Sequence, residues 1–274
     1  AKDKGRFTKG AVMALKARVL LCENRWQEVA AICDALINKQ EAGFLDLFSG
    51  TYSDLFKPQN KNNIEVLLDV QFMPVNREQG TQYYLIPPSF GGFAAISPTQ
   101  ELADSYLLLN GKTISDPSYN ELTPYNNRDP RLDATLIRHG SQLENPNGTF
   151  TTINTALGTG DNSINNSSNA TPTGYYVSKF YDKTARNMLQ SGSNLILIRY
   201  AEVLLMYAEA KAKLNDFGQT EWNMTIKKLR TRAGFTNTNA LDYPTVSNAE
   251  MEEIIRRERR SELAMEGLRL MDLR

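Results

Sequence analysis

Small and apolar residues recur at helical spacing near the start of the chain. Two such runs, "TKGAVMALKARVLLC" and "RWQEVAAICDALINK", are separated by a tight turn. Apolar side chains three and four residues apart lie on one face of a helix. The alanines allow two helices to approach closely, and Trp26 stands where an aromatic ring can fill the hairpin. The pattern predicts a helix pair over residues 8–40, similar to a tetratricopeptide repeat.

A strand and an irregular region are expected next. In residues 64–72, "IEVLLDVQF", apolar and polar positions largely alternate, as in a half-buried strand. Residues 73–98 are rich in Pro, Gly and aromatic side chains and predict an ordered loop. Thr99 is a possible N-cap for a short helix in "PTQELADSYLLLN", and "GYYVSKFYD" is strand-like. We therefore expect a mixed strand and loop region over residues 41–189.

Within that region, residues 140–174 have an unusually polar composition. Asn, Gly, Ser, Thr and Pro supply 25 of these 35 positions. Such a composition is typical of loops and predicts a flexible surface loop without a packed core. The stretch "GDNSIN" offers oxygen ligands, but position twelve of a helix–loop–helix calcium site would be Pro172 rather than Glu. We expect no metal ion there.

The remaining residues, 195–274, are expected to be helical. The run "NLILIRYAEVLLMYAEAKAKLN" predicts one long helix from Asn194, followed by a turn. The return helix, "TEWNMTIKKLRTRAG", should end at Gly234. Ser247 and Glu250 have the spacing of a capping box, which predicts the start of a last helix that continues through "IRRERRSELAMEGLRLMDLR".

That last stretch holds six arginines and four acids in twenty residues. On a helical wheel its apolar face also carries charged side chains. The residues on this face are Ile255, Glu258, Arg259, Glu262, Leu263, Glu266, Arg269, Leu270 and Leu273. Because an unpaired buried charge costs several kcal/mol, we expect a structural ion-pair network at a helix–helix contact. In "YNNRDPRL", Asp129 and Arg131 are expected to hold a turn through side-chain hydrogen bonds.

Composition narrows the possible chemistry. Lys plus Arg and Asp plus Glu both total 31, so the formal net charge is zero and a nucleic-acid partner is not expected. Cys22 and Cys33 are not spaced as metal ligands and are expected to be small buried side chains on neighbouring helices. His139 is the only histidine, which leaves little material for a metal site or a catalytic triad. No cofactor or metal is expected.

Several motifs together resemble the SusD/RagB family. They are "GRFTKGAVMALKARVLLC", "SPTQELADSY", "YNNRDPRL", "GYYVSKF", "RYAEVLLMYAEAKAKLN", "IKKLRTRAG" and "ERRSELAMEGLRLMDLR". They occur in the order seen in that family and cover almost the whole chain. The resemblance implies a mainly α fold in which tetratricopeptide-like helix pairs pack against a loop-rich region with a few short strands. Residues 1–274 would then form part of one such domain.

The resemblance also implies a function. Members of the family are lipoproteins on the outer-membrane surface that bind oligosaccharides for a TonB-dependent transporter of the SusC type, and they are not enzymes. They are longer than this chain and carry an N-terminal lipid anchor. Neither cysteine fits that anchor because both lie within predicted helices, so we expect any anchor to lie outside this sequence.

Ligand residues are expected in the loop "MPVNREQGTQYYLIPPSFGGF". Sugars bind between flat apolar rings and polar side chains that hydrogen-bond to their hydroxyl groups. The candidate stacking residues are Tyr83, Tyr84, Phe90 and Phe93, and the candidate polar partners are Asn76, Arg77 and Gln82. The alternative interpretation is that most of these aromatic side chains attach the loop to the core.

Two other functions remain open at this point. A tetratricopeptide-like scaffold would contact only protein and would need nothing beyond the helix pairs. A glycoside hydrolase would need two carboxylic acids in a cleft, either Glu262 with Glu266 or Glu101 with Asp104.

Overall fold

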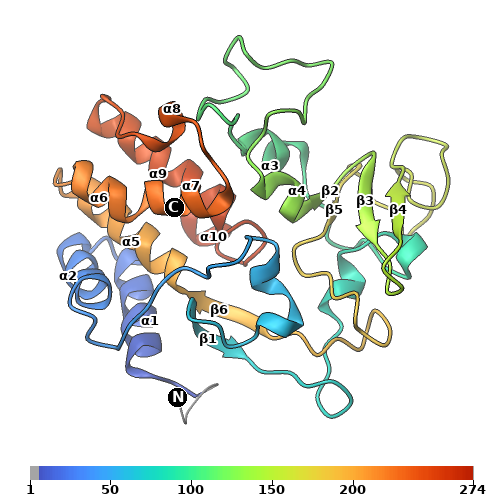
Figure 1. Ribbon diagram of the computed structural model, residues 1–274, viewed down its shortest axis with the longest axis horizontal. Coiled ribbons are helices and arrows are strands. Elements are labelled where there is room, and N and C mark those ends of the chain that lie inside the picture. Colours follow the sequence, from blue (N-terminus) through green and yellow to red (C-terminus); the bar gives the residue numbers. More distant parts are fainter. Residues whose placement is uncertain (1–5, 274) are drawn as a thin grey trace.

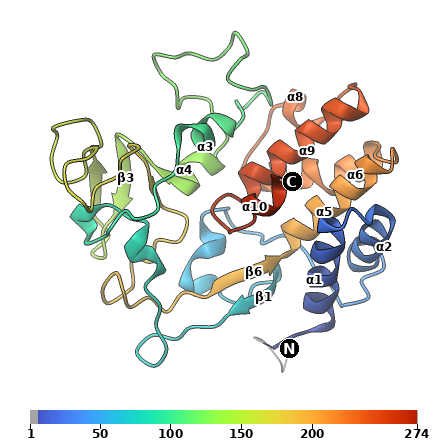
Figure 2. The same ribbon diagram turned by 180° about the vertical axis from the view of Figure 1, so that it is seen from behind.

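The computed structural model describes residues 6–273 and is mainly helical. Helices from both ends of the chain lie together on one side, whereas the middle of the chain forms the other side (Figures 1 and 2). The longer helices are α1 (Lys9–Cys22), α2 (Trp26–Ile37), α5 (Tyr200–Lys213), α7 (Ile226–Ala233) and α9 (Asn248–Glu262). The shorter helices are α3 (Gln100–Ser105), α4 (Arg131–Thr135), α6 (Gln219–Met224), α8 (Thr238–Leu241) and α10 (Arg269–Asp272).

The strands are short and form antiparallel pairs. The pairs are β1 (Val66–Val70) with β6 (Leu195–Arg199), β2 (Leu136–Ile137) with β5 (Tyr176–Val177), and β3 (Ser141–Glu144) with β4 (Phe150–Ile153). The 3₁₀ helices are η1 (Asp54–Phe56), η2 (Pro58–Asn60), η3 (Thr81–Tyr84) and η4 (Pro88–Phe90). The predicted fold class, mainly α with a loop-rich region and a few short strands, is confirmed.

The helix pair α1–α2 packs against α5 through small side chains. The hydroxyl of Thr8 caps α1 by accepting a hydrogen bond from the amide of Ala11 at 3.2 Å. Ala14 and Ala17 of α1 are fully buried in the same core as Ala208 of α5. Such alanines allow helix axes to approach closely, as the sequence predicted. Cys33 on α2 is likewise fully buried, whereas Cys22 at the end of α1 is half-buried.

The predicted long helix from Asn194 is wrong at its start. Leu195–Arg199 forms β6, which pairs with β1 so that Arg199 lies opposite Val66 and Ile198 opposite Leu68. Helix α5 begins only at Tyr200. A short apolar run fits a strand as well as a buried helix, and the available partner strand decides between them.

The return helix and the closing helix are both interrupted. Thr225, with φ −117° and ψ −87°, separates α6 from α7, and its hydroxyl bonds to the carbonyl of Glu221 at 2.6 Å. Helix α9 starts with the predicted capping box but ends at Glu262, because Met265 and Gly267 have positive φ angles of 64° and 80°.

Because α9 ends at Glu262, the apolar face predicted for one continuous closing helix does not extend to its last residues. Leu270 and Leu273 are 80% and 65% exposed, and so they do not share a buried face with Ile255. Gly234 does end α7 in the left-handed conformation, with φ 105°, as predicted.

Residues 140–174 are not a simple surface loop. Strands β3 and β4 form a hairpin whose Leu143 and Ile153 join a hydrophobic cluster with Tyr176. Ser163 and Thr171 are fully buried. The polar side chains make this possible by bonding locally, as when the hydroxyl of Ser163 donates to the carbonyl of Gly160 at 2.6 Å. The expectation of no packed core is wrong here.

Close packing of α1 gives a first prediction. Ala14→Leu should lower the free energy of unfolding by about 1–3 kcal/mol, because the added methylenes have no room in a filled core. Thermal and urea unfolding measure the change. Val12→Leu is the matched control on the same helix, since Val12 is 54% exposed. Equal stability of the two variants would contradict this account of the packing.

Candidate functional site

Three of the predicted ligand residues form one aromatic cluster. The ring of Tyr83 stacks on Phe93, with centroids 6.0 Å apart and planes inclined by 13°. Tyr84 meets Tyr83 edge to face at 5.2 Å. Tyr84 remains 46% exposed, whereas Tyr83 and Phe93 are half-buried. We call Tyr83, Tyr84 and Phe93 the aromatic platform.

The backbone beneath the platform is tightly folded. The amide of Phe93 donates to the carbonyl of Tyr83 at 2.5 Å, and the amide of Ile96 donates to that of Tyr84 at 3.1 Å. A Cβ atom at Gly92 would lie 2.1 Å from the carbonyl oxygen of Ile86, so only glycine fits there. The loop is therefore ordered, as the sequence predicted, and the rings are held in fixed positions.

Asn76 and Arg77 lie on a separate exposed turn. Met73 and Arg77 bond to each other through both backbone amides, at 2.7 and 3.0 Å, and Val75 between them has φ 72°. The guanidinium of Arg77 lies 5.3 Å from the ring centroid of Phe72. The amide of Asn76 approaches the sulfur of Met73 at 3.7 Å. Both polar side chains are exposed to solvent on this turn.

The other two predicted residues face the interior. Gln82 is 1% exposed, and its side-chain oxygen accepts a hydrogen bond from the amide of Asp182 at 2.8 Å. Phe90 packs edge to face on Tyr181 with centroids 6.0 Å apart. These two side chains attach the loop to residues 181–182, which matches the alternative interpretation for part of the set.

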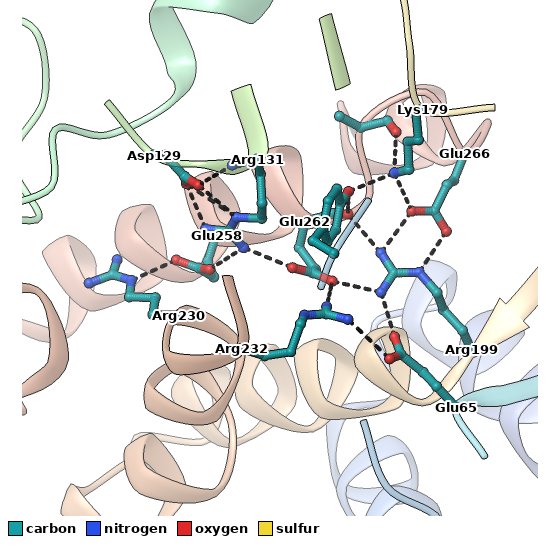
Figure 3. Close-up of polar contacts among 12 residues, drawn as sticks. Glu65, Asp129, Arg131, Lys179, Arg199, Arg230, Arg232, Glu258, Glu262 and Glu266 are labelled. Carbon is teal, nitrogen blue, oxygen red and sulfur yellow. Dashed lines mark hydrogen bonds and ion pairs between the residues drawn. The ribbon is translucent and has the colours of Figure 1, made fainter. Parts of the chain in front are cut away.

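The charged closing helix belongs to a buried ion-pair network, shown in Figure 3. The guanidinium of Arg131 binds Asp129 at 2.7 Å, Glu258 at 2.7 Å and Glu262 at 2.8 Å. Asp129 also accepts the backbone amide of Arg131 at 2.9 Å, which confirms the predicted turn. All four side chains are inaccessible to solvent.

A second arginine extends the network towards the strands. Arg199 at the end of β6 binds Glu65 at 2.7 Å, Glu262 at 2.6 Å and Glu266 at 2.7 Å. Lys179 binds Glu266 at 2.7 Å as well. From α7, Arg232 pairs with Glu262 and Glu65, and Arg230 pairs with Glu258. The predicted structural ion-pair network is therefore confirmed.

The electrostatics of this network do not suit a glycoside hydrolase. Burial by itself would raise the pKa of Glu262, but Arg232, Arg199 and Arg131 hold it far below the usual value. The pKa of Glu266 is lowered in the same way, against burial, by Arg199 and Lys179. A general acid needs the opposite shift and an open cleft, so this pair is structural.

The other proposed acid pair lies on α3. Glu101 and Asp104 line an open groove together with Arg256, Arg257 and Arg260 of α9. Asp104 also accepts a hydrogen bond from the side chain of Gln100 at 2.8 Å. This open groove of mixed charge is not the enclosed cleft, with two facing carboxyl groups, that glycoside hydrolysis needs.

Sequence reasoning missed the partners that come from distant segments. Glu65, Lys179 and Arg199 complete the network but lie far from the closing helix in sequence. The sequence feature that could have indicated these buried partners is a single charged residue beside an apolar run, as in "NIEVLLDV" and "LILIRYAEVLL". Such a charge is buried only when it is paired.

Comparison with known proteins decides the family. The model of the SusD family matches residues 65–274. This chain belongs to the SusD family. A relative, SusD-like protein P25 of Formosa agariphila, is 25% identical over 288 residues, which cover 99% of this chain and 50% of the relative. SusD-like protein P38 of the same species is 41% identical over 86 residues, or 30% of this chain and 16% of that protein.

Solved structures support this assignment. The crystal structure of a SusD-like carbohydrate-binding protein from Bacteroides fragilis aligns with a TM-score of 0.84 and 28% identity, covering 100% of this chain and 53% of that protein. Surface glycan-binding protein A from Bacteroides fluxus shares the fold, with a TM-score of 0.64 and 20% identity over 100% of this chain and 53% of that one. The SusD-family chain described here thus spans about half the length of these proteins.

Two structural features are absent from residues 6–273. No helix in this range is long and apolar enough to cross a membrane. No group of three or more His, Cys, Asp or Glu side chains within it is placed to hold a metal ion.

The network predicts a large effect from one substitution. Glu262→Gln should lower the free energy of unfolding by about 3–5 kcal/mol, because it leaves buried arginines without their shared carboxylate. Chemical denaturation measures the loss. Glu253→Gln is the matched control on the same helix: its pair with Arg256 is exposed, and stability should hardly change.

The same network sets the response to acid. The folded-state pKa values of Glu258, Glu262 and Glu266 lie below their ordinary value of 4.5. The unfolded chain therefore binds more protons at low pH, and stability present above pH 4.5 is lost as the pH falls below it. Denaturation midpoints from pH 7 to pH 3 should show this decline. A smaller decline in Glu262→Gln would assign it to the network, and an unchanged decline would not.

Proposed function

We propose that this SusD-family protein captures oligosaccharides at the cell surface and passes them to a TonB-dependent transporter of the SusC type. The observation that carries the proposal is the aromatic platform, an ordered set of rings with Tyr84 open to solvent. Support comes from relatives described as carbohydrate-binding and surface glycan-binding proteins. The location we propose is the surface of the outer membrane, with a lipid anchor.

The chemistry of the platform suits a sugar ring. The C–H face of a pyranose packs on an aromatic ring, while hydroxyl groups at its edge need hydrogen-bond partners. Tyr83 and Tyr84 offer both a ring and a phenol group. Asn76 and Arg77, on the separate exposed turn, are the polar partners that we propose. Gln82 and Phe90 would contribute indirectly, because they fix the loop to residues 181–182.

We propose binding without catalysis. Of the two acid pairs considered, Glu262 and Glu266 are held as buried anions by arginines. Glu101 and Asp104 lie in a groove lined with arginines. A transported oligosaccharide would thus leave the site with its glycosidic bonds intact.

A protein-binding scaffold is the second candidate, and one surface favours it. Val12, Leu15 and Val19 form an exposed apolar stripe along α1, with 54%, 38% and 55% of their surface open. Apolar stripes of this kind commonly contact other protein segments. A folded protein that binds no glycan would favour this function.

The platform predicts a loss of affinity in a binding experiment. Tyr84→Ala should weaken binding of the best oligosaccharide from a glycan array about tenfold, or about 1.4 kcal/mol, because one stacking surface is removed. Isothermal titration calorimetry on the full-length protein measures this change. Phe44→Ala is the matched control, since Phe44 is also an exposed ring, at 62%, but lies outside the loop. An unchanged affinity in Tyr84→Ala would remove the platform from the site.

A further inference from the structure

A polar cavity lies beside the platform loop, between the β3–β4 hairpin and the 3₁₀ helices η1 and η2. Its volume is about 350 Å³, at the small end of the range of ligand sites. The residues that matter for its chemistry are Asp54, Lys57, Glu144, Phe150, Tyr181 and Lys183. None of them belongs to the aromatic platform.

Lys57 gives this cavity a strong hydrogen-bond donor. Its ammonium group is half-buried and donates to the backbone carbonyl of Tyr181 at 3.0 Å. Burial lowers its pKa, although Asp54 and Asp182 oppose that shift. An ammonium group has three donors. With one bond made to Tyr181, the remaining donors of this cavity-lining group are available to a ligand.

The carboxylates of Asp54 and Glu144, which also line the cavity, supply hydrogen-bond acceptors near the ammonium group of Lys57. Asp54 accepts the hydroxyl of Thr51 at 2.7 Å through only one of its oxygens. Glu144 pairs with Lys183 at 2.5 Å across the cavity wall. A sugar hydroxyl both donates and accepts a hydrogen bond, so it can bridge an ammonium and a carboxylate at once.

Phe150 supplies the apolar surface that such a ligand needs. It lies on β4, lines the cavity and is 64% exposed. A large aromatic side chain so open to water on a hairpin gains little from burial in the fold. Its ring is placed to cover one face of a pyranose at the cavity rim.

The charge of the lining restricts the ligand. The cavity is lined by the carboxylates of Asp54, Asp133, Glu144 and Asp182, and by the two lysines Lys57 and Lys183. Arg138 pairs with Asp133 at 2.9 Å, which leaves three carboxylates against two lysines. This excess of negative charge would repel a sulfated sugar or a uronic acid. Uncharged sugars meet no such repulsion.

The cavity is also connected to the platform. Phe90, from the platform loop, packs on Tyr181 of the cavity wall. Gln82, next to Tyr83, bonds to the amide of Asp182, another lining residue. The same side chains therefore hold both surfaces in a fixed relation.

We propose that this cavity is a second subsite, which holds one uncharged sugar ring of an oligosaccharide between Phe150, Lys57 and Asp54. The proposal rests on the function proposed above. It adds a class of substrate, neutral glycans, and a set of residues from elements outside the platform loop. No bond is made or broken at this subsite.

Calorimetry with the full-length protein tests the subsite. The probes are neutral oligosaccharides of glucose, galactose, mannose and xylose, and their sulfated or uronic acid counterparts. The variants are Phe150→Ala and Lys57→Met, and Phe44→Ala is the control for loss of an exposed ring. We expect both cavity variants to weaken binding of the neutral probe about tenfold, while Phe44→Ala binds normally. Circular dichroism and thermal unfolding show which variants are folded.

Each outcome separates this proposal from the proposed function. Weaker binding in Tyr84→Ala alone, with Phe150→Ala unchanged, overturns the subsite and leaves glycan capture in place. Preference for the sulfated or uronic probes overturns the neutral class. Absence of binding to every probe by the folded protein overturns both proposals. If Lys57→Met does not fold, Phe150→Ala still decides, because an exposed side chain can be removed without disturbing the core.

Discussion

The carboxylate of Glu262 and the arginines around it are the interaction on which the rest of the structure depends. Three guanidinium groups, from Arg131, Arg199 and Arg232, converge on this one buried side chain. Removing such charges from water is costly, and the cost is offset only when every partner is in place. A misplaced segment would leave one of these buried charges unpaired, so the network stabilises only the correctly assembled fold.

The network also explains how a largely irregular region becomes rigid enough to hold the aromatic platform in place. Glu65, just before β1, pairs with Arg199 at the end of β6, so both strands are connected to the network. Lys179, which pairs with Glu266, lies two residues before Tyr181. From Tyr181 and Asp182 the contacts pass to Phe90 and to Gln82. The platform and the cavity are thus both connected to the ion-pair network through residues 179–182, although the loops themselves contain little regular structure.

Sequence reasoning succeeded where the signals were local. The α1–α2 pair, the capping box of Ser247 and the left-handed stop at Gly234 follow from spacing and from residue type alone. It failed where the partner lies far away: β6 became a strand only because β1 is beside it. The prediction for the polar stretch at 140–174 was wrong for another reason, since its Ser and Thr side chains replace water as hydrogen-bond partners of backbone groups. For the candidate site, residue type indicated the rings of the platform, which the structure brings together, but not that Gln82 and Phe90 face inward. Phe150 lies in a segment that was expected to be flexible.

The order of the network along the chain affects how the protein is made. Glu262 follows Arg131, Arg199 and Arg232 in the sequence, so during synthesis each of these arginines emerges before its shared carboxylate exists. Contacts that close such long loops form late in folding. Until α9 has been translated, Arg131 can pair only with Asp129, and Arg199 and Arg232 only with Glu65. Glu262 links these two groups of charges, so the complete network can form only after the segments that supply the arginines have emerged.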